Sequence, residues 1–544
     1  MGSDRNVMRM LGAFALTLLL ACSCSRGPTQ AEKAAAEGVI VIGNKVEPSS
    51  LDPHLTTSVE EGNIERALFE GLVAPNPETL APEPALATDW EESEDGQTYT
   101  FHLRPGLQWS DGTPIRSGDV LFSWRRLIEP GLASVNAELL FCVKGAKSFN
   151  EGKSQDFASV GIHTPDDATV VVTLERRTPW FLSILMHTSL AVLPETIIRA
   201  SGEPFARANG WTRSAELACS GPFVVKRWES GRVIELARNP HYWDAASVRL
   251  SGIQFLPIES INVEDTAFLG GQLHVTDTVP VGKIAFLRRQ GNPALHIEPY
   301  LGVYYYALNT TRPPLDNANV RRALSLAIDR RAIAVNLLGG AQREAKSFCP
   351  ALEGYAPPEI LRGDATLARQ LLADAGYPGG KGFPRIELLY NTSENHRMIA
   401  EAVQAMWKEN LGIDADLRNE DFNSYLGSRS GGDYEVIRAG WVADYPSEFS
   451  FLDLLLSNAG NNFAKWKNPD YDRLVQEAKD ATSPDEARAL AKRAETLLLG
   501  EAPIIPIYHY NTTRQISPAV HGWHANPMDW HPWKTVWVEP PKQE

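Results

Sequence analysis

The chain carries both periodicities of secondary structure from end to end. Tyr99, Phe101 and Leu103 alternate with polar residues, and this period of two predicts a strand with one buried face. Further apolar stretches predict strands at residues 39–42, 170–174, 233–236 and 304–308. Because helical patterns lie between these strands, the local pattern predicts an α/β or α+β fold with several lobes, without defining a topology.

Three helices have recognisable ends. Ser483-Pro484-Asp485-Glu486 reads as a capping box with proline at the first helical position, and it opens a helix that should end before Gly500. Asp364 is expected to cap a second helix that stops at Gly376. Residues 319–328 carry apolar side chains on one face and predict a third helix.

The N-terminus has the pattern of an export signal. Arg5 and Arg9 precede an apolar run from Leu11 to Ala21. A membrane-spanning helix needs about 20 apolar residues, so this run is too short to cross a bilayer. A basic start, a short apolar core and small residues after it predict a signal peptide over residues 1–21.

The apolar run ends in Leu19-Leu20-Ala21-Cys22, which resembles the bacterial lipobox. The resemblance implies cleavage before Cys22 and acylation of this cysteine, which would anchor the protein to a membrane. Cys24 is an alternative acylation site, and an ordinary secretory signal with a chance cysteine is the alternative for the whole segment. The small, polar and charged residues that follow predict a flexible tether over residues 22–38.

Composition describes a globular protein of more than one domain. The chain has 544 residues, of which 43% are hydrophobic and 22% charged, and its formal net charge is −15. No basic cluster stands out, so we expect no nucleic-acid partner. The five cysteines include no CxxC pair. With Cys22 acylated, four cysteines remain whose disulfide pairing stays open: Cys24, Cys142, Cys219 and Cys349.

The sequence offers no catalytic motif. None of the twelve histidines begins an HExxH, and we find no GxSxG or P-loop pattern. His521, His524 and His531 lie near Asp529, but their irregular spacing among tryptophans favours packing over a metal site. We therefore expect no enzyme activity and no cofactor, with an exported peptidase as the alternative.

Several short segments along the chain form a specific series: Ser50-Leu51-Asp52-Pro53-His54, Trp109-Ser110-Asp111-Gly112-Thr113-Pro114, Ser220-Gly221-Pro222-Phe223, Asn239-Pro240-His241-Tyr242-Trp243 and Asn317-Ala318-Asn319-Val320-Arg321-Arg322. In this order they resemble the peptide- and nickel-binding family of transporter solute receptors, and the resemblance covers nearly the whole mature chain. Within this family the stretch Arg438-Ala439-Gly440-Trp441-Val442-Ala443-Asp444-Tyr445 is most similar to the oligopeptide receptors.

The resemblance implies an α/β periplasmic-binding-protein fold of two lobes, joined by a hinge of two strands, with the ligand enclosed between them. Lobe I is expected from residues 39–59, 196–301 and 512–544, with an extra domain from 60–195 attached to it. Lobe II is expected from residues 302–511. Closure of the lobes on a ligand is the conformational change that this fold implies.

The implied function is that of a monomeric receptor in the periplasm or at the cell surface. It would bind oligopeptides largely independently of their sequence and deliver them to the permease of an ABC transporter. Sibling receptors for a dipeptide, a murein peptide, haem or a nickel chelate are alternatives within the same fold. A tethered chaperone or adhesin is a third possibility.

The resemblance also assigns residues to the two charged ends of a peptide. Asp444 matches the aspartate that pairs with the α-ammonium group, and Glu47 matches an acidic position near it. Arg438 and His396 match cationic positions for the carboxylate. The alternatives are a turn aspartate before Pro446, a structural ion pair for Arg438, a surface histidine and an exposed glutamate.

Other matching positions are expected to line the peptide cleft. They are Trp441, Gly440, Ala443, Tyr306, Phe422 and Asn136, and simple core packing is the alternative for the aromatic ones. Relatives often carry tryptophan at the position of Phe422 and tyrosine near that of Asn136. A lysine of the subfamily has no counterpart here, because leucine stands where it would fall in residues 336–338. Gly302 and Val442 replace two cysteines that are bonded to each other in some relatives.

Overall fold

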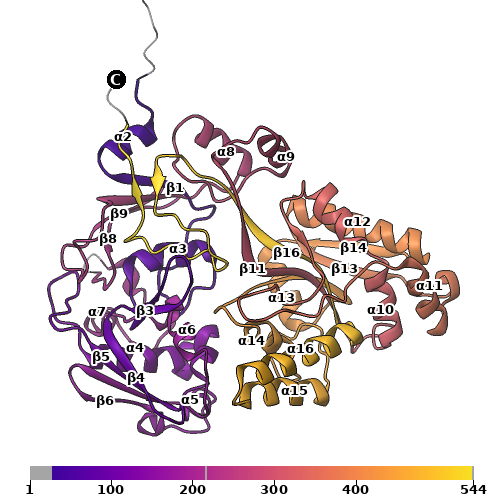
Figure 1. Ribbon diagram of the computed structural model, residues 1–544, viewed down its shortest axis with the longest axis horizontal. Coiled ribbons are helices and arrows are strands. Elements are labelled where there is room, and N and C mark those ends of the chain that lie inside the picture. Colours follow the sequence, from indigo (N-terminus) through magenta and orange to yellow (C-terminus); the bar gives the residue numbers. More distant parts are fainter. Residues whose placement is uncertain (1–26, 215–216, 542–544) are drawn as a thin grey trace, which may run out of the picture.

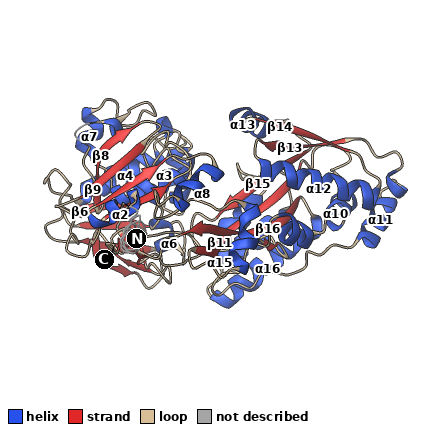
Figure 2. Ribbon diagram, turned by 90° about the horizontal axis from the view of Figure 1, so that it is seen from above, coloured by secondary structure: helices blue, strands red, loops and turns tan. Residues whose placement is uncertain are grey.

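A computed structural model describes residues 27–214 and 217–541. Two lobes lie side by side in both views of the ribbon (Figures 1 and 2). The first lobe contains the N-terminal half of the chain and the C-terminal segment, and the second contains residues from about 300 to 510. The predicted two-lobed α/β fold is therefore confirmed. Lobe I, extra domain and lobe II below denote the residue ranges expected from the sequence.

Lobe I is built on a four-stranded sheet of order β1-β10-β9-β8, in which β1 and β10 are parallel. Its strands are β1 (Val39–Gly43), β8 (Phe223–Glu229), β9 (Val233–Arg238) and β10 (Gly252–Leu256). Its further helices and strands are α7 (Glu195–Ala200), α8 (Ile261–Leu269), α9 (Val281–Arg289), β17 (Val520–His521) and β18 (Trp537–Val538).

The extra domain carries a second four-stranded sheet, of order β4-β5-β7-β6. Tyr99, Phe101 and Leu103 are buried on one face of β5, as their alternation predicts. The strands are β2 (Val73–Pro75), β3 (Pro82–Pro84), β4 (Ala87–Glu92), β5 (Thr98–Leu103), β6 (Ile162–Asp166) and β7 (Thr169–Thr173). The α-helices are α4 (Ser117–Ile128), α5 (Ala146–Asn150) and α6 (Phe181–Leu185).

Lobe II contains a six-stranded sheet of order β12-β16-β11-β15-β13-β14. The strands are β11 (Leu295–Leu308), β12 (Arg343–Glu344), β13 (Ile386–Asn391), β14 (Ala415–Glu420), β15 (Val436–Val442) and β16 (Ile504–Gln515). The helices are α10 (Ala318–Leu326), α11 (Ala365–Asp374), α12 (Glu394–Leu411), α13 (Phe422–Gly431), α14 (Phe449–Leu452), α15 (Pro469–Asp480) and α16 (Pro484–Glu501). A π-helix, η6 (Ala332–Leu337), follows α10.

Strands β11 and β16 connect the two lobes. They pair antiparallel from Leu295 opposite Gln515 to Ala307 opposite Ile504, with two interruptions in register. Beyond β16, Ile516 bridges to Val275 of lobe I. Figure 1 shows both strands passing from one lobe to the other, which is the expected two-strand hinge.

Gly302 and Val442 are direct partners in the ladder between β11 and β15. The resemblance implies bonded cysteines at these two positions in some relatives. Their pairing in adjacent strands is compatible with such a cross-link.

The predicted helix ends are close to those observed. Asp364 accepts a hydrogen bond from the Leu367 amide and caps α11, as expected. Helix α16 begins at Pro484, but the Ser483 side chain makes no capping bond and the helix runs past Gly500 to Glu501. The capping box therefore predicted the start of the helix correctly, but the predicted capping hydrogen bond of Ser483 is not observed.

The prediction of a flexible tether was wrong for part of residues 22–38. Residues Gln30–Ala36 form helix α2, whose N-cap Thr29 and Glu32 make a complete capping box. Ala31 and Ala35 are buried, and the Ala31 amide donates to the Gly271 carbonyl oxygen of lobe I. Alanine is the strongest helix former, so a small-residue composition suits a helix as well as a linker.

The expected start of the extra domain also falls too early. Helix α3 (Val59–Leu68) contributes Ile64, Ala67 and Leu68 to the core that contains β1, β9 and β10. The chain therefore leaves lobe I after α3 and not at residue 60.

The signal peptide and the lipid anchor at Cys22 lie outside the described residues. None of the described helices combines the length and apolar composition needed to cross a bilayer. Cys142, Cys219 and Cys349 are free thiols in the described part of the chain.

Candidate functional site

One edge of strand β15 is open where the two lobes meet. On one side β15 pairs with β11 along its whole length, from Val436 to Val442. On the other side β13 pairs only with Val436 and Ile437. Residues 438–442 therefore have no strand partner on that edge among the described residues. An extended segment could add to this edge through backbone hydrogen bonds.

Arg438 lies at the start of the open edge. Its guanidinium is 4.7 Å above the ring of Tyr304, and its Nη2 donates to the Tyr510 hydroxyl at 3.1 Å. Its Nε atom is buried without a hydrogen-bond acceptor, and the guanidinium has no ion pair within the described ranges. An anion would satisfy this unpaired cation, because a buried charge without a partner is costly.

His396 lies against the same group of side chains. Its ring is 5.6 Å from that of Tyr304, and its Nδ1 is buried without a partner. Burial lowers the pKa of His396 to about 2, and the charges of Arg438 and Lys45 lower it further. The histidine is therefore neutral near pH 7 and offers a hydrogen bond, not a charge.

Lys45 brings a cation from lobe I toward this cluster. It follows β1, its Nζ is 2.8 Å from a carboxylate oxygen of Glu60, and its backbone has a positive φ of 48°. Its charge contributes to the lowered pKa of His396, after burial and Arg438. A cation of lobe I, already paired with Glu60, thus acts on this group of side chains.

Asp444 follows the open edge at its other end. Its amide donates to the Ser450 hydroxyl at 3.0 Å. Its carboxylate has neither a hydrogen bond nor an ion pair within the described ranges. Burial raises the pKa of Asp444 to about 7, with a further contribution from Glu138 of the extra domain. An ammonium group would stabilise the ionised form of this carboxylate.

Two expected site residues have other partners. Both carboxylate oxygens of Glu47 are engaged within lobe I, by Trp228 Nε1 at 2.6 Å and the Gly231 amide at 3.1 Å. The Asn136 amide group donates to the Thr56 carbonyl and the Ser189 hydroxyl. Both side chains therefore hold loops of the first lobe in place, and direct contact with a ligand remains a prediction.

The expected wall residues divide into three groups. Tyr306 is fully buried in the core of lobe II, edge-on to Tyr304, so core packing accounts for it. Trp441 is half-buried, with its Nε1 atom enclosed and without an acceptor. Phe422 is 58% exposed and stacks on Tyr425, whose hydroxyl donates to the Arg438 carbonyl oxygen. Trp441 and Phe422 thus remain available to a ligand.

The surroundings of Gly440 and Ala443 differ, but both positions favour a small residue. A Cβ on Gly440 would lie 2.8 Å from the Tyr510 hydroxyl and 3.2 Å from Arg438 Nη2. Ala443 is buried, and its amide donates to the Leu301 carbonyl oxygen of the hinge. Sequence reasoning missed Tyr510, Lys45 and Glu138, because none of them lies within a segment that carried the resemblance.

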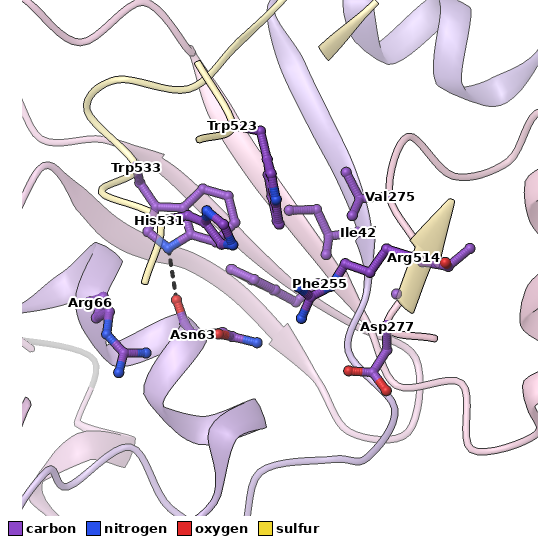
Figure 3. A pocket seen from close by; sticks show the side chains of 12 residues that line it. Ile42, Asn63, Arg66, Phe255, Val275, Asp277, Arg514, Trp523, His531 and Trp533 are labelled. Carbon is purple, nitrogen blue, oxygen red and sulfur yellow. Dashed lines mark hydrogen bonds between the residues drawn. The ribbon is translucent and has the colours of Figure 1, made fainter. Parts of the chain in front are cut away.

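A small cavity in lobe I is a different feature. Figure 3 shows Arg66, Asp277 and Arg514 around it, with Trp533 donating to the Asn63 carbonyl oxygen. Its volume is about 20 Å³, enough for a water molecule and far too small for a peptide.

The histidines near the C-terminus have separate partners. His531 Nε2 is hydrogen-bonded to a carboxylate oxygen of Asp529 at 2.9 Å. The Asp529 carboxylate also accepts hydrogen bonds from both Nη atoms of Arg514. His521 stacks on Trp537, whereas His524 lies 3.3 Å from Glu78. Within the described ranges no group of such side chains is arranged to hold a metal ion.

Comparisons with known proteins place this architecture in a family. Residues 81–463 match the model for bacterial extracellular solute-binding proteins, family 5. The periplasmic oligopeptide-binding protein OppA of Escherichia coli is 34% identical over 528 residues, covering 94% of this chain and 93% of that protein.

Solved structures agree with the match over almost the whole length. The murein tripeptide-binding protein MppA of Escherichia coli superposes with a TM-score of 0.84 at 34% identity, covering 93% of this chain and 99% of MppA. Haemophilus influenzae OppA in complex with the peptide RPPGFSPFR gives a TM-score of 0.82 at 33% identity, covering 92% and 99%. The chain therefore belongs to the bacterial extracellular solute-binding proteins of family 5.

Proposed function

We propose that this protein is an extracytoplasmic receptor that binds oligopeptides with little dependence on their sequence. The observation that carries the proposal is the open edge of β15, which has an unpaired guanidinium at one end and an unpaired carboxylate at the other. A peptide in extended conformation offers backbone groups for the edge and one opposite charge for each end. No feature of a side chain is needed for these contacts, so many sequences would bind.

The spacing of the two charges limits the ligand. Asp444 lies six positions after Arg438, and an extended chain covers at most about 20 Å over six positions. A peptide that reaches both charges therefore has no more than about six residues. The similarity to OppA proteins and to a peptide complex of one of them supports this class of ligand.

The same comparison supports a location for the receptor and a transporter subunit to which it delivers its ligand. Relatives named as periplasmic binding proteins support a periplasmic receptor that passes its ligand to an ABC-type permease. Acylation of Cys22 would hold the receptor at a membrane, and a monomer suffices because both charged ends lie within one chain. Catalysis and a cofactor have no place in this mechanism.

Isothermal titration calorimetry with three forms of trialanine tests the proposal. The free peptide should bind, whereas N-acetylation or C-terminal amidation should each weaken binding at least about tenfold, because each removes one charge. No binding of free peptides of two to six residues would reject the proposal. A receptor for murein peptides is the second candidate, since MppA is equally similar, and the corresponding murein tripeptide should then outcompete trialanine.

A further inference from the structure

Helices α8 and α9 of lobe I expose a group of apolar side chains to solvent. Val263 and Leu269 of α8 and Phe286 of α9 are 58%, 61% and 50% exposed, and these three are called the α8–α9 surface below. An ion pair between Asp265 of α8 and Lys283 of α9 joins the two helices. Leu269 lies one turn after Asp265. Phe286 lies one turn after Lys283, so both apolar side chains lie beside the ion pair.

The charges on these two helices favour an anionic partner. Both acids of α8, Glu264 and Asp265, are buried and bonded within lobe I. Helix α9 contains no acid, and its Arg288 and Arg289 are exposed. The whole chain has a net charge of −15, so a basic and partly apolar surface is a local exception. Exposed apolar side chains beside cations are typical of surfaces that bind anionic lipids.

Helix α2 attaches the start of the described chain to the same part of lobe I. The Ala31 amide donates to the Gly271 carbonyl oxygen at 2.9 Å, two residues after the end of α8. Ala34 of α2 and Phe268 of α8 pack against one small apolar cluster. Figure 1 shows α2, α8 and α9 along the upper edge of the molecule. The chain N-terminal to α2 therefore leaves lobe I beside the α8–α9 surface.

The proposed lipid anchor is only a short way along the chain from this point. Thr29 is the N-cap of α2, and it lies seven positions after Cys22. Even a fully extended chain covers no more than about 25 Å over seven positions. An acylated Cys22 would therefore keep the α8–α9 surface close to the bilayer. The extra domain lies at the opposite edge of the molecule (Figure 1).

We propose that the α8–α9 surface rests on the membrane that holds the anchor, with its apolar side chains among the headgroups of anionic lipids. The proposal rests on acylation of Cys22, which is part of the proposed function. The anchor keeps the chain at the bilayer, and the α8–α9 surface determines which face of lobe I turns toward it. A bilayer is favoured over a protein partner, because the short link to Cys22 brings this surface within reach of lipid.

Quenching of a fluorescent dye by lipid headgroups tests this contact. The full acylated chain is placed on vesicles of equal parts phosphatidylglycerol and phosphatidylcholine that contain a lipid with a nitroxide on its headgroup. Leu269→Cys and Phe286→Cys carry the dye within the surface. Val135→Cys is the matched control, because Val135 is 62% exposed but belongs to the extra domain. Cys24→Ser and Cys142→Ser remove other reactive thiols from all three proteins.

The dye on Leu269→Cys and on Phe286→Cys should be quenched at least about twofold more strongly than the dye on Val135→Cys. Equal quenching at all three positions would overturn the proposal, because the anchored protein then has no preferred face. So would a lack of quenching at every position. Mass spectrometry of the N-terminal peptide shows whether Cys22 is acylated. With acylation present, either result leaves the anchor intact, whereas a chain without acyl groups overturns both the anchor and the membrane contact.

Discussion

Arg438 on β15 donates a 3.1 Å hydrogen bond from its Nη2 atom to the hydroxyl of Tyr510 on β16. The Tyr510 side chain can lie there because two glycines leave room for it. A Cβ on Gly302 would come within 2.7 Å of the Tyr510 ring, and a Cβ on Gly440 within 2.8 Å of its hydroxyl. The orientation of the Arg438 guanidinium thus depends on glycine at two positions, Gly302 on β11 and Gly440 on β15.

Gly440→Ala should therefore weaken the binding of free peptides by at least about tenfold, because a Cβ 2.8 Å from the Tyr510 hydroxyl forces Tyr510, and with it the bonded Arg438, to move. Calorimetry with trialanine measures the loss. Tyr510→Phe removes the hydroxyl that the new methyl group meets, so adding it to Gly440→Ala should restore part of the affinity. A double variant no better than Gly440→Ala would show that the collision is not the cause.

Arg438→Ala should cost about 2 to 5 kcal/mol of binding free energy for a peptide with a free C-terminus, the range for truncating one side of a buried charge pair. The same variant should bind a C-terminal amide almost as the wild type does, since that peptide has no carboxylate to pair. Calorimetry with the acid and the amide separates the two effects. An equal loss for both peptides would contradict a direct contact between Arg438 and the ligand carboxylate.

Peptide affinity should fall as the pH drops through 7. Burial, with Glu138, raises the pKa of Asp444 to about 7 in the free protein, and a bound ammonium lowers it again. Binding therefore favours the ionised form, and affinity should decrease up to about tenfold per pH unit below 7. His396, with a pKa of about 2, stays neutral over this range and does not contribute.

The α-ammonium of the peptide loses its proton above pH about 8, so affinity should peak between pH 7 and 8. Titrations from pH 5.5 to 8 check the profile. Asp444→Asn should bind weakly and without the loss between pH 7 and 5.5. A wild-type affinity that is constant from pH 5.5 to 7.5 would exclude Asp444 as the ammonium partner.

Trp180→Ala should weaken peptide binding about fivefold, because the stack on Phe449 joins the extra domain to lobe II and such aromatic pairs contribute about 1 kcal/mol. Trp180→Phe keeps a ring at this position and serves as the control. Small-angle scattering should also show a larger radius of gyration for Trp180→Ala with bound peptide at saturation. If affinity and radius both match the wild type, the stack does not stabilise the closed arrangement.

Local patterns predicted individual elements better than their connections. The strand at 98–103 and the helices after Asp364 and Ser483 were visible in the sequence because their signals lie within a few residues. The hinge could not be found this way, since β11 and β16 are about 200 residues apart and pair only in the folded chain. It was predicted from the family resemblance.

The site shows the same division. Arg438 and Asp444 belong to one continuous segment that carried the resemblance, and neither has an ion pair among the residues that the structure describes. The hydrogen bonds of Glu47 to Trp228 and Gly231 could not be predicted locally, because these partners come from a hairpin some 180 residues later. Glu138 had no local signal, because its contribution to the raised pKa of Asp444 comes from a part of the chain some 300 residues away.

The most direct measurement is mass spectrometry of whatever the purified protein releases on denaturation. The full chain should be expressed, purified without unfolding and then denatured in acid. We expect a mixture of short peptides of varied sequence, six residues or fewer, and their loss from Asp444→Asn. A single defined compound that is not a peptide, released in stoichiometric amount, would contradict it.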